Sequence, residues 1–224
     1  MRARVSRFVF GAVLLVIGPA VATEPTTPSW HKLGDSNGIA VFGRDVPGTS
    51  LIAMRGECVM DASMLRLASV LVDTARAREW IDSVAETRTL RKLSETEYVQ
   101  WNHVATPFIV QDRDFVFITK LELAPKDGRV TLSYRSTTDP LAPKTHYVRG
   151  EFIYGKFALT SLGVNKTKVE AELLCDPRGS VAKWMVNLVQ KDWPYSTLSR
   201  LRRQAKKPDI VDNEKLRQAL AQPG

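Results

Sequence analysis

The strongest constraint on the fold of this chain is a change of hydrophobic period near its C-terminal end. Between residues 86 and 175, apolar residues mostly recur at every second position, which is typical of half-buried β-strands. Between residues 181 and 201 they recur at every third or fourth position, which indicates one long amphipathic helix. Two short helices, at 64–71 and 73–80, are predicted before these strands. The order predicts an α+β fold, in which a curved antiparallel sheet buries one face against the long helix.

The N-terminal part predicts a three-strand meander. Asn37-Gly38 between apolar residues is a strong hairpin signal, and Pro47-Gly48 marks the next turn. Asp61 is the predicted N-cap of the first short helix. The later predicted strands cover residues 86–93, 95–103, 113–123, 129–136, 147–154, 156–162 and 166–175, with loops at 104–112 and 137–146.

The first 22 residues are typical of a secretory signal peptide. Three arginines precede the apolar run Phe8–Ile17, and Ala20-Val21-Ala22 forms a small-residue cleavage site. We expect cleavage after Ala22 and a periplasmic or secreted protein; the alternative is an uncleaved membrane anchor. Cleavage would leave 29 basic and 24 acidic residues, a net charge of +5 instead of +8. Such a mildly basic protein can contact anionic lipid and does not require a nucleic-acid partner.

The composition excludes several other classes. A hydrophobic content of 44% and a charged content of 25% are near the globular average, which excludes a disordered or coiled-coil chain. Two cysteines and three separated histidines give neither a disulfide framework nor a metal-binding motif. No nucleophile elbow, P-loop or dinucleotide fingerprint occurs, so we predict no cofactor, no metal and no catalytic residue. We interpret the charged residues Asp112, Arg113 and Asp114 and the nearby His103 as structural.

Several segments together resemble one known family. The resembling segments are Gly38–Phe42 with Arg44, Glu79-Trp80, Leu93–Tyr98, Asp112–Val116, Val148–Gly150 and Asp176–Asn187. Their order over residues 28–205 resembles a bacterial StAR-related lipid-transfer (START) domain. The Arg-Asp-Phe start of a strand at Arg113 and the entry to the last helix are the more specific parts.

The resemblance implies a helix-grip fold, in which the sheet holds the C-terminal helix across the mouth of an apolar tunnel. The tunnel takes one lipid or sterol-sized ligand. The loop 104–112, which contains Pro107, and the helix 180–204 are implied to form its gate. Two features depart from the family. Ala182 stands where a proline is frequent, and Gln100 and Thr119 stand where some sterol-binding members bury an acid and an arginine.

Alternation with charged residues predicts the inward faces of two strands: Phe115, Phe117, Thr119 and Leu121 on 113–123, and Val169, Ala171 and Leu173 on 166–175. On 95–103 the alternation is ambiguous, because Tyr98, Gln100 and Asn102 oppose Val99, Trp101 and His103.

The residues expected to line the tunnel lie on the inward sides of the predicted strands and helix. They are Tyr98, Gln100, Asn102, Phe117, Thr119, Leu132, Tyr134, Phe157, Trp184, Met185 and Leu188. A solid core without a cavity would show the same pattern. Three of these residues are neutral and polar, and each would cost about 1–3 kcal/mol if buried without a partner. A ligand headgroup or a bound water would satisfy them.

The prediction that follows is non-enzymatic binding, and transfer, of a lipid or other hydrophobic small molecule by a monomer. The alternatives are an enzyme of cyclase or hydrolase type on the same fold, and a ligand-sensing or protein-interaction module. Pro194 removes one backbone hydrogen bond inside the last helix and is the expected hinge of the gate. The alternative is that it only curves a rigid helix around the sheet. Basic residues crowd that helix; they predict contact with an anionic membrane, although cations also complement a helix C-terminus.

The predicted organisation is a signal peptide at 1–22, a lipid-binding domain at 23–205 and a tail at 206–224 that contains a short helix. The strand order that the resemblance implies also separates the two cysteines. Cys58 and Cys175 lie near the C-terminal ends of antiparallel neighbours, about 20 Å apart. A disulfide needs Cα atoms within about 7 Å, so we predict that they do not pair.

Overall fold

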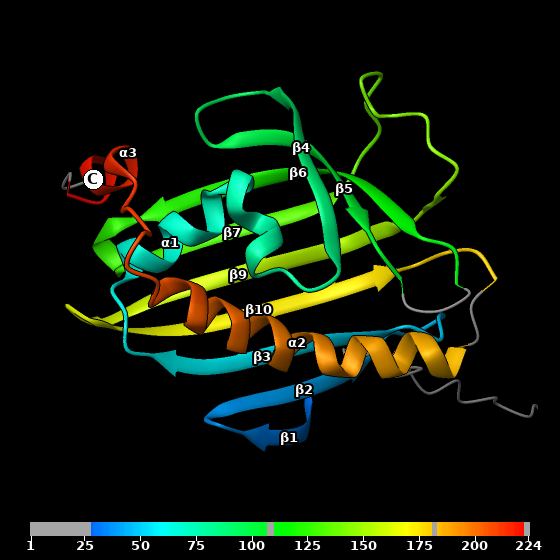
Figure 1. The fold of residues 1–224 in the computed structure, drawn as a ribbon. Helices are drawn as coiled ribbons and strands as arrows, with labels where there is room; N and C mark the ends of the chain where they lie inside the picture. The colour runs from blue at the N-terminus through cyan, green and yellow to red at the C-terminus, as the bar shows by residue number, and fades with distance from the viewer. Residues whose placement is uncertain (1–27, 107–109, 181–182, 222–224) are drawn as a thin grey trace, which may run out of the picture.

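The computed structural model describes residues 28–106, 110–180 and 183–221, with the backbone alone over 183–190. In this part of the chain, ten strands form one sheet in the order β1-β2-β3-β10-β9-β7-β6-β5-β4, with β8 paired to β6. All neighbours are antiparallel except β6 and β8. Helices α1 and α2 lie on one face of the sheet, here called the inner face (Figure 1). The α+β class predicted from the sequence is confirmed.

The N-terminal meander forms as predicted. Strands β1 (His31–Ser36), β2 (Ile39–Asp45) and β3 (Ile52–Met60) pair in sequence order. Both Asn37 and Gly38 have positive φ, 51° and 70°, as a two-residue hairpin turn requires. The meander joins the rest of the sheet through β3 and β10 (Lys166–Asp176), where Met60 lies opposite Thr167 and Met54 opposite Leu173.

This strand order agrees with the prediction for the cysteines. Cys58 lies opposite Val169, and Cys175 is six residues further along β10, so their Cα atoms are about 20 Å apart. No disulfide joins the two residues.

The two short helices form where the sequence placed them, but the predicted cap was wrong. Helix α1 spans Met64–Val72, and a 3₁₀ helix, η1, spans Thr74–Glu79. Ser63 caps α1 in place of Asp61: its hydroxyl accepts a hydrogen bond from the backbone N–H of Arg66 at 3.1 Å. The backbone of Ala62 is held outside the helix, because its carbonyl accepts a hydrogen bond from Thr167.

The next strands keep the predicted order. They are β4 (Val84–Lys92), β5 (Glu97–Val104), β6 (Arg113–Ala124) and β7 (Arg129–Ser136), with a 3₁₀ turn, η2, at Pro125–Asp127. Burial alternates along β6 from Phe117 to Glu122, so the predicted inward positions of Phe117, Thr119 and Leu121 are confirmed. Phe115 also points inward, where its ring stacks on Phe152, although its neighbour Val116 is buried in a separate cluster on the outer face.

The sequence predicted two strands at 147–154 and 156–162, and this was wrong. One long strand, β9 (Glu151–Gly163), runs through Gly155, and only a two-residue strand, β8 (Val148–Arg149), precedes it. Ile153 is the extra residue of a β-bulge, because Tyr154 pairs with Leu174 and Phe152 pairs with Cys175. The bulge turns Phe152 toward the aromatic residues of the inner face, among them Phe115.

Helix α2 (Lys183–Ala205) closes the inner face, and its second half is packed tightly. Leu198 and Leu201 are fully buried in the main core. Pro194 lies inside the helix and packs on Gly56 of β3, where an added Cβ would be 2.9 Å from the Pro194 Cβ. The predicted terminal helix forms as α3 (Glu214–Ala221), and Ile210 and Leu216 of this last segment join the same core.

Candidate ligand-binding site

Four aromatic rings form a wall at one end of the inner face. Phe115 and Phe152 stack with ring centroids 4.2 Å apart and an interplanar angle of 8°. Phe117 and Tyr134 each meet Phe152 edge to face, with centroids 5.4 and 5.2 Å away. Strands β6, β7 and β9 supply these side chains, so the wall belongs to the sheet and does not depend on a loop.

A glycine allows one of these rings to lie against the sheet. Gly155 of β9 lies opposite Tyr134 of β7, and a Cβ at Gly155 would be 2.1 Å from two ring carbons of Tyr134. Only glycine leaves room for this close approach. Burial raises the pKa of the Tyr134 phenol above its usual value, so the hydroxyl stays neutral at physiological pH.

The polar residues predicted to line the tunnel bond to other protein groups. Gln100 Oε1 accepts from the Thr119 hydroxyl at 2.6 Å, and Gln100 Nε2 donates to Thr74 Oγ1 at 3.1 Å. Asn102 Oδ1 accepts from the Thr87 hydroxyl. Because η1 and β4 supply partners that the sequence did not reveal, these atoms do not require the ligand headgroup or bound water that the sequence analysis assigned to them.

The remaining predicted lining residues differ in position. Tyr98 lies at the edge of the site and donates its hydroxyl to the carbonyl of Glu95 at 2.8 Å. Leu132 and Phe157 are buried in the main core. Pro107 and the side chains of Trp184, Met185 and Leu188 lie outside the described residues.

A second aromatic group lies beneath α2, and sequence reasoning missed most of it. The Phe157 ring meets Trp80 of the segment after η1 at 6.1 Å and Trp193 of α2 at 6.4 Å. Trp193 follows the apolar spacing of the helix, and this signal could have identified it. Phe152 was hidden by the bulge, which breaks the alternation that the sequence analysis used.

Arg113 ties together the two segments that the family resemblance assigns to the gate. Its guanidinium is almost fully buried and donates to the carbonyls of Gln111, Pro177 and Arg178, the last two at 3.3 Å. One carbonyl belongs to the loop before β6 and two belong to the loop that leads to α2. Burial lowers the pKa of Arg113 from its usual value.

The acidic residues of this cluster are engaged on the outer face. Asp114 is completely buried and accepts from Arg149 at 2.7 and 2.9 Å, from Trp101 Nε1 at 2.8 Å and from Thr145 at 3.0 Å. Burial alone would raise its pKa, but these hydrogen bonds outweigh burial and hold the pKa below its usual value. Asp112 pairs with His103 at 2.7 Å. These contacts agree with a structural role.

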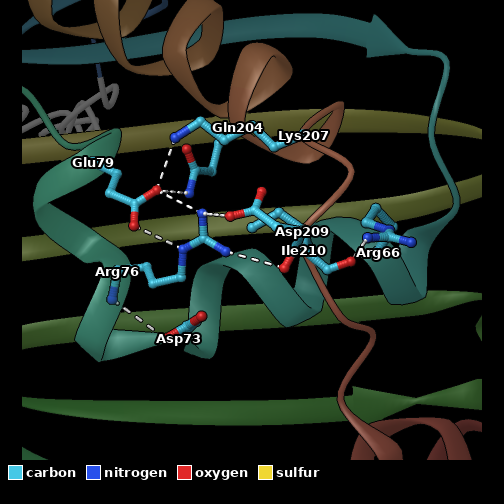
Figure 2. Close-up of polar contacts among 8 residues, drawn as sticks. All are labelled: Arg66, Asp73, Arg76, Glu79, Gln204, Lys207, Asp209 and Ile210. Atoms are coloured by element: carbon cyan, nitrogen blue, oxygen red, sulfur yellow. Dashed lines mark hydrogen bonds and ion pairs between the residues drawn. The ribbon is translucent and has the colours of Figure 1, made fainter.

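A polar network fastens the C-terminal end of α2 to η1 (Figure 2). Glu79 accepts from Gln204 at 2.9 Å and from Lys207 at 2.8 Å, and it forms a bidentate pair with Arg76. Arg76 also reaches Asp209 at 2.9 Å. The hydrogen bonds from Arg76, then Gln204 and Lys207, hold the pKa of Glu79 well below its usual range. Together with Pro194 on Gly56, this network fixes the second half of the helix.

Two general features complete the description of this part of the chain. No group of three or more His, Cys, Asp or Glu side chains gathers as a metal site among the described residues. None of the described helices is long and apolar enough to span a bilayer.

Comparison with known proteins identifies relatives along most of the chain. An uncharacterized protein of Pseudomonas aeruginosa is 26% identical over 196 residues, covering 88% of this chain and 94% of that protein. A STAR-related lipid transfer protein of Xanthomonas axonopodis is similar in structure, with 28% identity and a TM-score of 0.71 over 80% of this chain and 99% of that one. Human StAR-related lipid transfer protein 5 has 17% identity and a TM-score of 0.74 over 82% of this chain and 88% of that one.

A more distant structure has an enzymatic name. The Zhui aromatase/cyclase from Streptomyces has 14% identity and a TM-score of 0.51 over 69% of this chain and 93% of that one, a likeness of fold alone. The START domain family model matches residues 24–204. Because this match spans most of the 224 residues, the chain belongs to the START domain family.

Proposed function

We propose that this protein binds a lipid or another hydrophobic small molecule between the inner face of the sheet and α2, and transfers it without chemical change. The observation that carries the proposal is the aromatic wall of Phe115, Phe117, Tyr134 and Phe152, whose members come from three strands of the inner face. A START fold supports binding of lipids and hydrophobic ligands.

Organic extraction and mass spectrometry of the purified protein test this proposal. We expect a lipid or hydrophobic molecule in stoichiometric amount. The protein after detergent stripping is the control and should take up one equivalent again from vesicles. Failure to retain or take up any hydrophobic molecule would refute the proposal.

Release is proposed to depend on bending of α2 at Pro194. The second half of the helix is fastened to η1, so movement is expected in the half before the proline. Pro194→Ala restores the missing backbone donor, stiffens the helix and should slow exchange of a fluorescent lipid between vesicles with binding unchanged. An unaltered exchange rate would contradict the hinge.

Contact with an anionic membrane is also proposed. Lys191, Arg203 and Lys206 are exposed on α2 and after it, and they form no ion pair within the described residues. By contrast, Arg200 pairs with Asp82 and Lys207 with Glu79. Vesicle co-sedimentation should increase with the fraction of anionic lipid and decrease with salt.

The proposed location is periplasmic or extracellular, after removal of residues 1–22. N-terminal sequencing of the protein from its host would identify the first residue of the mature chain, and a chain that begins at Met1 would contradict the proposal.

We further propose a monomer that does not bind nucleic acid. Light scattering measures the mass in solution and so tests whether the protein is a monomer. A filter-binding assay tests whether it binds nucleic acid.

The second candidate function is an enzyme of cyclase type, which the similarity to the aromatase/cyclase favours. The engagement of Asp112 and Asp114 in outer-face contacts speaks against these acids as catalysts. Recovery of the extracted molecule in a chemically altered form after incubation would favour the enzyme.

A further inference from the structure

The tip of the hairpin between β9 and β10 exposes two aliphatic side chains. Leu162 is 52% exposed and Val164 is 88% exposed. Val164 and Asn165 form the two-residue turn of this hairpin. Turns are mostly built from Gly, Pro, Asn, Asp and Ser, so the fold does not call for an aliphatic side chain at so exposed a position.

Three basic residues lie beside these two side chains. Lys166 follows the turn directly, and Lys126 and Arg129 belong to the neighbouring turn, which joins β6 and β7. The two turns are in contact, because the backbone N–H of Ser161 donates to the carbonyl of Gly128 at 2.8 Å. Residues 125–129 and 161–166 are here called the tip surface.

The positive charge of the tip surface is not neutralised by the protein. Its three basic side chains are exposed, and none of them forms an ion pair with another residue that the structure describes. By contrast, Lys168, further along β10, pairs with Glu57 and Glu170. Asp127 is the one acidic residue of the tip surface, so three basic residues and one acidic residue leave a net charge of +2.

The tip surface lies at the end of the sheet opposite to the segments that the resemblance assigns to the gate. Strand β9 begins at Glu151, which pairs with Asp176 just before the loop that leads to α2, and it ends at Gly163. Its 13 residues span about 40 Å. Figure 1 shows the tip of this hairpin at the left and the start of α2 at the right. A flat surface that touches the tip therefore leaves the other end uncovered.

The end of α2 lies at the same end of the molecule as the tip surface. Lys206 borders a pocket together with Gly38 and Met60. Met60 lies opposite Thr167, the residue after Lys166. One of the cations proposed above for membrane contact is therefore placed to act together with the tip surface.

A lipid bilayer fits this surface better than a protein does. A stable protein interface buries about 800 Å² on each partner around aromatic or arginine anchors, and lysine is depleted there. The tip surface offers two aliphatic side chains among lysines and an arginine. A bilayer needs only a shallow insertion of apolar side chains, and its anionic headgroups attract the cations around them.

We propose that the tip surface docks on an anionic bilayer. Leu162 and Val164 enter the boundary between headgroups and acyl chains, and the three basic residues contact the headgroups. The gate then faces away from this bilayer. The inference rests on the proposed membrane contact and names the surface that makes it.

Co-sedimentation with vesicles of equal parts phosphatidylcholine and phosphatidylglycerol tests the apolar part of the surface. All proteins are purified from the host, so that they carry the same N-terminus. The test variant combines Leu162→Gln with Val164→Thr. The matched control combines Leu141→Gln with Ile153→Thr, which changes two other exposed aliphatic residues, in the loop after β7 and near the start of β9.

We expect the test variant to bind these vesicles about 10-fold more weakly than the wild type, because two aliphatic side chains no longer leave water. The control should bind as the wild type does. Equal binding of the test variant and the wild type would overturn the inference. A greater loss in the control would place the contact at the gate end and would also overturn it.

Two triple variants test the charges. The test variant replaces the basic residues of the tip surface, Lys126→Gln, Arg129→Gln and Lys166→Gln. The control lowers the net charge equally at exposed basic residues elsewhere, Arg78→Gln, Arg135→Gln and Lys144→Gln. Each basic residue at an anionic surface strengthens binding about 5-fold, so the test variant should bind roughly 100-fold more weakly at low salt. An equal loss in both would show attraction by net charge alone and would contradict the tip surface.

A fluorescent label tests the insertion directly. The dye nitrobenzoxadiazole on Val164→Cys should shift to shorter wavelength when vesicles are added, and the same dye on Leu141→Cys should not. Absence of the shift at position 164 would overturn the inference. Failure of the wild type to bind any vesicle would overturn the proposed membrane contact itself. Binding of the neutral fluorescent probe N-phenyl-1-naphthylamine reports the ligand site separately and should be unchanged in every variant.

Discussion

Substitution of Gly56 by alanine tests whether α2 is seated directly on β3. An added Cβ at this position would be 2.7 Å from Leu198 Cδ1 and 2.9 Å from Pro194 Cβ. Carbon atoms prefer separations of about 3.5–4.0 Å, so the shortfall is about 0.8 Å against Leu198 and about 0.6 Å against Pro194. The leucine methyl can rotate away, but the proline ring is part of the helix backbone. The helix itself must therefore shift.

We expect Gly56→Ala to lower the free energy of unfolding by about 1–3 kcal/mol, as overpacking of a core does. For a domain of this size the melting temperature should fall by about 2–12 °C. Denaturation followed by circular dichroism measures the stability, and binding of N-phenyl-1-naphthylamine measures the effect on the site.

Gly34→Ala on β1 is the matched control. Its added Cβ would have no atom within 4 Å, and its φ is not positive. The control should be neutral or stabilising by about 0.4–1 kcal/mol, because alanine restricts the unfolded chain. If Gly56→Ala behaves like this control, the helix is not seated on Gly56 and the fixed second half of α2 must be reconsidered.

Further predictions concern the wall, the outer face, the network and the thiols. Gly155→Ala should push the Tyr134 ring into the interior, because the added Cβ would overlap that ring. The loss in binding free energy for the hydrophobic fluorescent probe N-phenyl-1-naphthylamine should exceed the loss in the free energy of unfolding, as parallel binding and denaturation curves would reveal. Asp114→Asn should destabilise the protein by about 1–3 kcal/mol at neutral pH. Because the folded pKa of Asp114 lies below its usual value, its contribution is present above about pH 4 and is lost as the pH falls toward the folded pKa, so the variant should show a smaller loss of stability in acid. Glu79→Gln should speed hydrogen exchange in residues 198–205 of α2, and unchanged exchange would argue against the network as a fastening. Burial raises the pKa of Cys175 to about 12 and also raises that of Cys58, so a thiol reagent at pH 8 should label both only after denaturation; an absence of thiols in the denatured, non-reduced protein would refute the strand order.

Alternation predicted the faces of β6 and β10 because polar side chains mark their outer sides. On β5 it was ambiguous, and the structure explains why. The loop after β7 covers the outer face there, so Trp101 and Val99 pack against Val116, with Ala142 and Tyr147 against them. Both faces of β5 therefore carry buried residues. A two-residue period cannot distinguish the faces of a strand that is covered on both sides.

The site was predictable in part. Phe117 and Tyr134 follow from strand alternation, since a regular strand turns every second residue inward. Phe152 does not, because one bulged residue reverses the alternation on β9. The hydrogen bonds from Gln204 and Lys207 to Glu79 depend on how η1 meets the end of α2, and no local pattern in a sequence reports a contact between residues so far apart.

The pairing of β3 with β10 has a consequence for how this chain folds. Met60 and Thr167 are adjacent in the sheet but more than one hundred residues apart in the sequence, so the meander cannot join the sheet until nearly the whole domain has been synthesised. The two ends of this long loop must meet before any contact between them stabilises the chain, and this entropic cost slows folding. Folding on the millisecond-to-second scale is typical of such topologies. Until β10 arrives, the edge of β3 is unpaired, and chaperone binding during synthesis should act at this stage.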